Sequence, residues 1–205
     1  MIGILDLGMG NLRSVSNALY SLGYDFAVIN EPGQTQDISH LVIPGVGAYT
    51  KAMRRLEEQN LKQYVLRFVS SGRPLLGICL GMQLLSERGE EGGDTEGLGL
   101  IPGKVCKFSD SPQIATPHVG WNSVRQLIDH PIFYKVKQDA DFYFVHSYYF
   151  DCSAASSIYA VTEYGRDFSS VVGRENVVGV QFHPEKSQVN GMRLLENFCG
   201  WNGSC

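Results

Sequence analysis

A cysteine between two glycines has the clearest chemical meaning in this 205-residue sequence. Cys79 lies in Gly77-Ile-Cys-Leu-Gly81, between an apolar run that ends at Gly77 and a run, Met82–Arg88, that favours a helix. This order predicts a strand, a sharp turn and a helix, which is the layout of a nucleophile elbow with cysteine in place of serine. Such a turn exposes the sulfur, and the helix N-terminus offers backbone N–H groups to an oxyanion. The alternative is a structural cysteine in a glycine-rich strand end.

A cysteine nucleophile needs a base, and the base needs a group that orients it. His183-Pro-Glu185 offers both, because side chains two residues apart on an extended segment point the same way. Pro184 disfavours a helix here. The alternative is a histidine at a strand end beside an unrelated surface glutamate. His146 is a second candidate base, but it has no acidic residue at a comparable spacing, so His183 is favoured.

The first 88 residues alternate between strand and helix patterns. Short apolar runs predict strands at Ile2–Leu5, Phe26–Ile29 and Leu41–Ile43 and before Cys79, and apolar residues at helical spacing occupy the intervals. This order predicts a parallel sheet with helices on both faces. The glycine-rich turn Pro44–Gly47 and Cys79 would then meet at the carboxyl edge of the sheet, where active sites gather.

After Gly89 the pattern changes to an acidic, glycine-rich surface loop followed by short alternating strands. We expect these strands at Lys104–Phe108, Asn122–Arg125, Phe142–His146, Ile158–Thr162, Ser169–Val172 and Val177–Gln181, before a helix over Gly191–Phe198. With no linker or repeat in view, the sequence predicts one α/β domain over residues 1–205. Its central sheet would be mostly parallel and flanked by helices, with antiparallel strands added in the C-terminal half.

Composition excludes several classes of function. The net charge is −4 and no run of lysine and arginine occurs, so nucleic acid is not an expected partner. No apolar run approaches the roughly 18 residues of a membrane span, and the N-terminus does not resemble a signal peptide. Five cysteines without close pairs argue against a disulfide framework and a zinc site, so we expect a cytoplasmic protein without metal or cofactor.

Six blocks in a fixed order carry a resemblance to a known family. They are Asp6–Asn11, Pro44–Ala48, Gly77–Gln83, His118–Asn122, Phe144–Tyr148 and Gln181–Ser187. Together they resemble the class I glutamine amidotransferases, and among these the glutaminase subunits of imidazole glycerol phosphate synthase. The blocks span nearly the whole chain, which makes the resemblance far more specific than any single motif.

The resemblance implies hydrolysis of glutamine to glutamate and ammonia by a Cys-His-Glu triad. Cys79 would attack the side-chain amide, His183 would transfer the proton, and Glu185 would orient the imidazole. The resemblance also implies oxyanion contacts from the backbone N–H groups of Val46, Gly47 and Leu80, and glutamine contacts from Gln83, Ser147 and Tyr148.

The resemblance further implies a partner. The ammonia would pass to a cyclase subunit in a heterodimer, for imidazole glycerol phosphate synthesis in histidine biosynthesis. His118, Trp121 and Asn122 would face that subunit, although the same block also fits a buried tryptophan beside a turn. Activity would depend on the partner, through a peptide flip at Val46.

Two features depart from the expected pattern, namely Gln188 in place of a small residue and the tail Trp201–Cys205. They leave room for a paralogous subunit that supplies ammonia to a sugar-modifying amidotransferase of surface polysaccharide biosynthesis. Two further alternatives are a non-catalytic binding protein and a cysteine peptidase or hydrolase. The complete triad disfavours the first, and Gln83 together with the Pro44–Gly47 turn disfavours the second.

Overall fold

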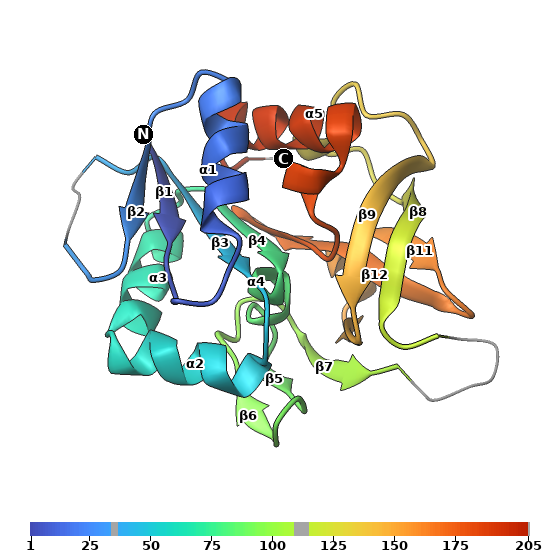
Figure 1. Ribbon diagram of the computed structural model, residues 1–205, viewed down its shortest axis with the longest axis horizontal. Coiled ribbons are helices and arrows are strands. Elements are labelled where there is room, and N and C mark those ends of the chain that lie inside the picture. The colour runs from blue at the N-terminus through green and yellow to red at the C-terminus, as the bar shows by residue number, and fades with distance from the viewer. Residues whose placement is uncertain (34–36, 109–114, 205) are drawn as a thin grey trace.

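The computed structural model describes residues 1–33, 37–108 and 115–204 (Figure 1). The strands are β1 (Ile2–Leu5), β2 (Phe26–Ile29), β3 (His40–Gly45), β4 (Leu75–Cys79), β5 (Arg88–Gly89), β6 (Thr95–Glu96), β7 (Gly103–Lys107), β8 (His118–Gln126), β9 (Ala140–His146), β10 (Tyr148–Cys152), β11 (Ile158–Glu163), β12 (Asp167–Arg174) and β13 (Val177–Val180). The helices are α1 (Leu12–Ser21), α2 (Tyr49–Glu58), α3 (Leu61–Ser70), α4 (Leu80–Gln83) and α5 (Gln188–Gly200), with 3₁₀ turns η1 (Pro131–Phe133), η2 (Ala155–Ser157) and η3 (Pro184–Lys186).

The centre of the molecule is a parallel sheet in the order β2-β1-β3-β4-β13. Its first four strands come from the N-terminal half, and β13 returns from the C-terminal end of the chain to pair with β4. The prediction of an α/β fold with a mostly parallel central sheet is confirmed. The return of β13 matters for function, because it brings the residues that follow Val180 beside the end of β4.

Alternating side chains of the parallel strands divide the core into two layers. Ile4 and Ile78 pack with helices α1 and α5 on one face of the sheet. Leu5 and Leu75 pack with helices α2 and α3 on the other face. A strand buried on both faces reads as a continuous apolar run, which is why these short segments were recognisable in the sequence.

The C-terminal half adds antiparallel strands to this sheet, as predicted. β12 pairs with β13 and leads outward through β10 to β7, while β11, β8 and β9 form a branch from β12. Figure 1 shows β8, β9 and β11 together at the end of the molecule opposite β2. The end of the sheet that carries β2 is therefore all parallel, and the antiparallel strands lie at the other end.

The predicted helix over Met82–Arg88 is wrong. Helix α4 ends at Gln83, and the chain then turns and enters the short strand β5 at Arg88. Tertiary hydrogen bonds take over the backbone here: Leu98 N–H donates to the Leu84 carbonyl, and Gly97 N–H donates to the Glu87 carbonyl. The expected surface loop after Gly89 accordingly contains part of a β-hairpin, β5–β6.

The unexpected residue Gln188 adopts a left-handed conformation, with φ of 50° at the start of α5. Glycine takes such angles without steric cost, whereas other residues are strained by about 1–2 kcal/mol. The departure from the small residue expected here is therefore a tolerated strain, remote in sequence from Cys79.

Four cysteines, Cys79, Cys106, Cys152 and Cys199, are free, and Cys205 lies outside the described residues. Within the described ranges no cluster of three or more histidine, cysteine, aspartate or glutamate residues is placed to hold a metal ion. Across the same ranges, no helix has the length and apolar character that crossing a membrane requires.

The turn that follows β4 is built from glycines that have no room for a side chain. A Cβ atom on Gly81 would lie 1.7 Å from the Ile43 carbonyl oxygen, and one on Gly77 would lie 2.5 Å from the Gly81 oxygen. Both obstacles are backbone atoms, so no side-chain rotation relieves them. The two glycines of the motif thus let β4, α4 and β3 pack in direct backbone contact.

We expect Gly81→Ala to lower the free energy of unfolding by at least about 3 kcal/mol, because the added methyl overlaps a fixed carbonyl. Urea unfolding of both proteins measures this difference. Gly200→Ala is the matched control, since no atom lies within 4 Å of its Cβ position, and it should leave stability unchanged or slightly higher. Equal stability of Gly81→Ala and wild type would contradict the packing described for this turn.

Candidate active site

Cys79 occupies the sharp turn between β4 and α4. Its backbone angles, φ 54° and ψ −108°, lie in a sparsely populated region for a residue with a side chain. In the sheet, Cys79 is the register partner of Gly45, so the Pro44–Gly47 turn lies beside it. The predicted meeting of these two turns at the carboxyl edge of the sheet is confirmed by that register.

His183 and Glu185 form a buried pair behind the cysteine. The Nδ1 atom of His183 lies 2.8 Å from Oε1 of Glu185, and both side chains are at most 2% exposed. The segment is not the extended strand that the sequence predicted, because Pro184 begins the 3₁₀ turn η3. The turn still brings the two side chains together, and His183 N–H donates to the Tyr143 carbonyl, which ties the turn to β9.

The environment of His183 favours its protonated form. Burial lowers the pKa of this imidazole, but the neighbouring Cys79 sulfur and the Glu185 carboxylate outweigh burial and raise the pKa to about 9. The Nε2 atom of His183 is buried, and it has no hydrogen-bond partner among the described residues. Nε2 is therefore not tied to another group, although the Cys79 sulfur is close enough to raise the pKa of the ring, and it is left available to exchange a proton.

Two further groups contact the sulfur. The Cys79 thiol lies 3.9 Å from the Val145 carbonyl oxygen, and the Gln181 side-chain amide donates to Sγ over 3.7 Å. Gln181 is fully buried and was not among the predicted site residues. Its place in the motif two residues before His183, directly after β13, was the available signal.

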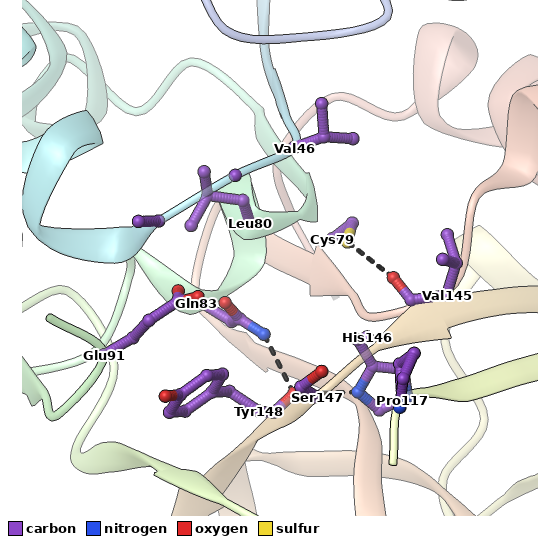
Figure 2. A pocket seen from close by; sticks show the side chains of 12 residues that line it. Val46, Cys79, Leu80, Gln83, Glu91, Pro117, Val145, His146, Ser147 and Tyr148 are labelled. Atoms are coloured by element: carbon purple, nitrogen blue, oxygen red, sulfur yellow. Dashed lines mark hydrogen bonds between the residues drawn. The ribbon is translucent and has the colours of Figure 1, made fainter.

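A pocket of about 360 Å³ opens beside Cys79 (Figure 2). Its walls include all six predicted oxyanion and substrate residues, Val46, Gly47, Leu80, Gln83, Ser147 and Tyr148, together with Ala48, Glu91, Pro117, Val145 and His146. The volume lies within the range of small-molecule sites. One wall comes from the parallel half and the other from the end of β9 and start of β10.

Gln83 joins the two walls of this pocket. Its Nε2 donates to the Tyr148 carbonyl over 3.0 Å and to Oε1 of Gln181 over 3.1 Å. Gln181 in turn donates to the Cys79 sulfur. The amide of Gln83 is therefore held in place by the site, and it fixes the distance between helix α4 and strand β10.

Glu91 is a pocket residue that sequence reasoning missed. Its Oε2 accepts a hydrogen bond of 2.9 Å from Tyr49 N–H, and burial raises the pKa of the carboxyl group while that bond lowers it. A carboxylate on this wall complements an ammonium group. No local pattern marks Glu91 as a site residue, because it lies in an acidic, glycine-rich stretch typical of a surface loop.

The three residues predicted to face a partner lie on β8 and differ in exposure. Trp121 is 49% exposed, and its neighbour Val119 is 56% exposed, which gives the strand an apolar outer face. His118, by contrast, is buried at 3% exposure. It stacks on Tyr164 with ring centroids 3.9 Å apart. Asn122 connects the exposed face of β8 to this buried histidine, because its Nδ2 atom lies 3.3 Å from Nε2 of His118.

The geometry agrees with comparisons to known proteins. The family model described as "Glutamine amidotransferase class-I" matches residues 3–200. Among solved structures, "Crystal structure of glutamine amidotransferase" matches with a TM-score of 0.76 at 20% identity, covering 97% of each chain. "Structure of PurLQS from Thermotoga maritima" gives a TM-score of 0.76 at 15% identity with the same coverage. These structures share the fold.

Curated relatives are more similar in sequence. "Imidazole glycerol phosphate synthase subunit HisH" of Desulfitobacterium hafniense strain DCB-2 is 47% identical, covering 98% of this chain and 94% of that protein. The subunit of the same name from Symbiobacterium thermophilum is 46% identical, covering 96% and 92%. The chain belongs to the class I glutamine amidotransferase family, in the branch of the imidazole glycerol phosphate synthase HisH subunits.

The raised pKa of His183 predicts a pH-dependent contribution of Glu185 to stability. Attraction between the imidazolium and the carboxylate is present below pH 6.5 and is lost as the pH rises through about 9. The difference in unfolding free energy between wild type and Glu185→Gln should therefore shrink by at least about 1 kcal/mol from pH 6 to pH 9.5. Urea unfolding at several pH values measures it.

Glu175→Gln is the control for this experiment, because Glu175 has a side chain that is 78% exposed. Its difference from wild type should stay nearly constant over the same pH range. A constant difference for Glu185→Gln as well would contradict an ionised His183–Glu185 pair.

Proposed function

We propose that this chain is the glutaminase subunit of imidazole glycerol phosphate synthase, and that Cys79, His183 and Glu185 are its catalytic triad. The observation that carries the proposal is the elbow cysteine on the wall of a pocket, backed by a buried His183–Glu185 pair with Nδ1 and Oε1 2.8 Å apart. Membership of the HisH branch supports the same function. All 205 residues act as a single domain in this proposal.

Catalysis proceeds in two steps. The Cys79 sulfur attacks the side-chain carbonyl carbon of glutamine, and the proton from the thiol, held by His183, passes to the leaving ammonia. Water then hydrolyses the thioester, with His183 as the base, and releases glutamate. Glu185 accepts a hydrogen bond from Nδ1–H and so keeps Nε2 facing the reaction. No metal or cofactor enters either step.

The backbone N–H groups of Val46, Gly47 and Leu80 serve the oxyanion of each tetrahedral intermediate. A donor of this kind is worth about 3–4 kcal/mol in the transition state. Gly47 has φ of 110°, a conformation open to glycine, so the adjoining peptide can reorient at low cost. A flip of the peptide at Val46, which is 41% exposed, is the proposed switch between resting and active states.

Glutamine is held between the two walls of the pocket. Ser147 and Tyr148 supply backbone contacts, Gln83 fixes the wall on which they lie, and the Glu91 carboxylate receives the α-ammonium group. Glu91 already accepts from Tyr49 N–H through Oε2, which positions its carboxylate before substrate arrives. The mixture of one charged group and several backbone groups suits a small zwitterionic amino acid.

Ammonia released here needs an acceptor, and we assign that role to a cyclase subunit in a cytoplasmic heterodimer that serves histidine biosynthesis. The outer face of β8, with Val119 and Trp121 about half exposed, is the proposed docking surface. Tryptophan is among the residues that most often act as interface anchors, and Val119 extends the apolar surface beside it. Asn122 lies at the inner edge of this surface, where its side-chain amide contacts the buried His118 ring.

The decisive experiment measures glutamate release from glutamine with and without a cyclase subunit of imidazole glycerol phosphate synthase and its nucleotide ligand. We expect strong activation by the cyclase and a loss of at least about 10³-fold in Cys79→Ala, because the nucleophile is removed. Cys199→Ala, a buried cysteine away from the pocket, is the control and should retain activity.

If glutamate release depended on Cys79 but was not stimulated by the cyclase, the partner would instead be a sugar-modifying amidotransferase of surface polysaccharide biosynthesis. Absence of release under every condition would overturn the enzymatic proposal.

The proposed interface predicts that Trp121→Ala weakens cyclase binding at least about thirtyfold, as expected for an aromatic anchor. Titration calorimetry with the purified subunits measures the dissociation constant. Tyr20→Ala is the matched control, because this aromatic side chain is 79% exposed on α1, well away from β8 (Figure 1). If both substitutions weakened cyclase binding equally, or if neither weakened it, the proposed docking surface on β8 would be contradicted.

A further inference from the structure

Two buried histidines, His146 on the pocket wall and His118 behind it, have no part in the mechanism above. His118 and His146 are register partners on the paired strands β8 and β9, and Nδ1 of His118 lies 3.0 Å from Nε2 of His146. Aromatic rings surround them: Phe144, Tyr164 and Phe168 lie within 6 Å of the His118 ring centre. Such a site disfavours charge, and burial lowers the pKa of His118 to about 4 and that of His146 to about 3.

The hydrogen bond at the pocket end of this pair determines which nitrogen of His146 carries hydrogen. Nδ1 of His146 lies 2.8 Å from the Tyr148 carbonyl oxygen, which only accepts hydrogen bonds. Nδ1 of His146 therefore carries a hydrogen. In a neutral ring, Nε2 is then an acceptor, and it receives its hydrogen bond from His118.

The contacts of Asn122, at the other end of the pair, independently determine which nitrogen of His118 carries hydrogen. Oδ1 of Asn122 accepts from Ser123 N–H over 2.8 Å, and Nδ2 donates to the Glu163 carbonyl over 2.9 Å, so the orientation of the amide is determined. The same Nδ2 lies 3.3 Å from Nε2 of His118. That nitrogen must accept, and the hydrogen of His118 is on Nδ1, facing His146.

Both ends thus give the same direction of donation. The hydrogen bonds run from Asn122 to His118, from His118 to His146, and from His146 to the Tyr148 carbonyl. A proton added to either ring would set two N–H groups against each other at one of these contacts. The chain is complete only when both imidazoles are neutral and carry hydrogen on Nδ1.

The carbonyl at the end of this chain belongs to the site. The Tyr148 oxygen also accepts from Gln83, which is linked through Gln181 to the Cys79 sulfur. Figure 2 shows the Gln83 amide pointing toward the strand that carries Ser147 and Tyr148. Because a carbonyl with two donors has little freedom to turn, the chain holds the wall against which glutamine would lie.

We propose that His118 and His146, as neutral Nδ1–H tautomers, are positioning residues that connect Asn122 on β8 to the Tyr148 carbonyl of the glutamine pocket. The proposal rests on the proposed glutaminase function for its kinetic consequence, but the tautomers themselves do not depend on it. The two rings hold substrate-binding groups in place and take no proton from substrate.

The tautomers can be read directly by nuclear magnetic resonance on the full chain labelled with ¹⁵N-histidine. We expect Nδ1 of both residues to show the shift of a protonated nitrogen and Nε2 that of an unprotonated nitrogen, from pH 6 to pH 8. Spectra of His118→Asn and His146→Asn assign the signals among the five histidines. An Nε2–H tautomer or an imidazolium at either position would overturn the proposal, whether or not the chain is a glutaminase.

The kinetic arm compares two variants of His146 in the presence of the cyclase. His146→Asn keeps a donor at the position of Nδ1, whereas His146→Leu removes it. We expect His146→Leu to raise KM for glutamine about tenfold with a smaller change in kcat, and His146→Asn to restore most of the affinity. His40→Asn is the control, because the His40 ring bonds the Trp201 carbonyl instead.

Several results count against the positioning role. Equal KM values for the leucine and asparagine variants, or a loss confined to kcat, would overturn it. If His146→Leu does not fold, the asparagine variant and the tautomer measurement still decide the question. A wild-type chain without Cys79-dependent glutamate release, but with both Nδ1–H tautomers, would defeat the proposed function and leave the hydrogen-bond chain standing.

Discussion

The architecture of the site depends on one steric constraint, the contact between the elbow and the neighbouring strand. Gly81 approaches the Ile43 carbonyl so closely that no side chain fits between them, and Gly77 meets the backbone of Gly81 in the same way. This contact forces Cys79 into an unusual backbone conformation and holds it beside the Pro44–Gly47 turn. Strain at such a position persists because the surrounding backbone leaves no alternative.

The two halves of the fold contribute different chemistry to the site. The parallel half supplies Cys79 and the Pro44–Gly47 turn, and the antiparallel half supplies the wall formed by Ser147 and Tyr148. Strand β13 joins them, because it pairs with β4 on one side and with β12 on the other. The residues that follow it, from Gln181 to Glu185, therefore arrive beside Cys79 although they are about a hundred positions away in sequence.

Neighbouring groups shift the pKa values of two buried histidines of the same site in opposite directions. His183 faces a carboxylate and the cysteine sulfur, which raise its pKa, whereas His146 faces a carbonyl and a second imidazole among aromatic rings, and its pKa falls to about 3. Burial alone would lower both. The partner of each ring, more than its depth, decides whether it can exchange a proton or only hold a position.

The sequence by itself determined the parallel half of the fold and singled out Cys79, His183 and Glu185 as the candidate reactive groups, because doubly buried strands, glycine-bounded turns and the spacing of His183 and Glu185 are local patterns. It failed where long-range contacts overrode local preference. Helix α4 ends at Gln83 because the chain from Leu84 to Glu87 is hydrogen-bonded to residues near Gly97. The pocket role of Glu91, the contact of Gln181 with the sulfur and the burial of His118 were likewise decided by tertiary structure, since each depends on strands that pair far apart in the chain.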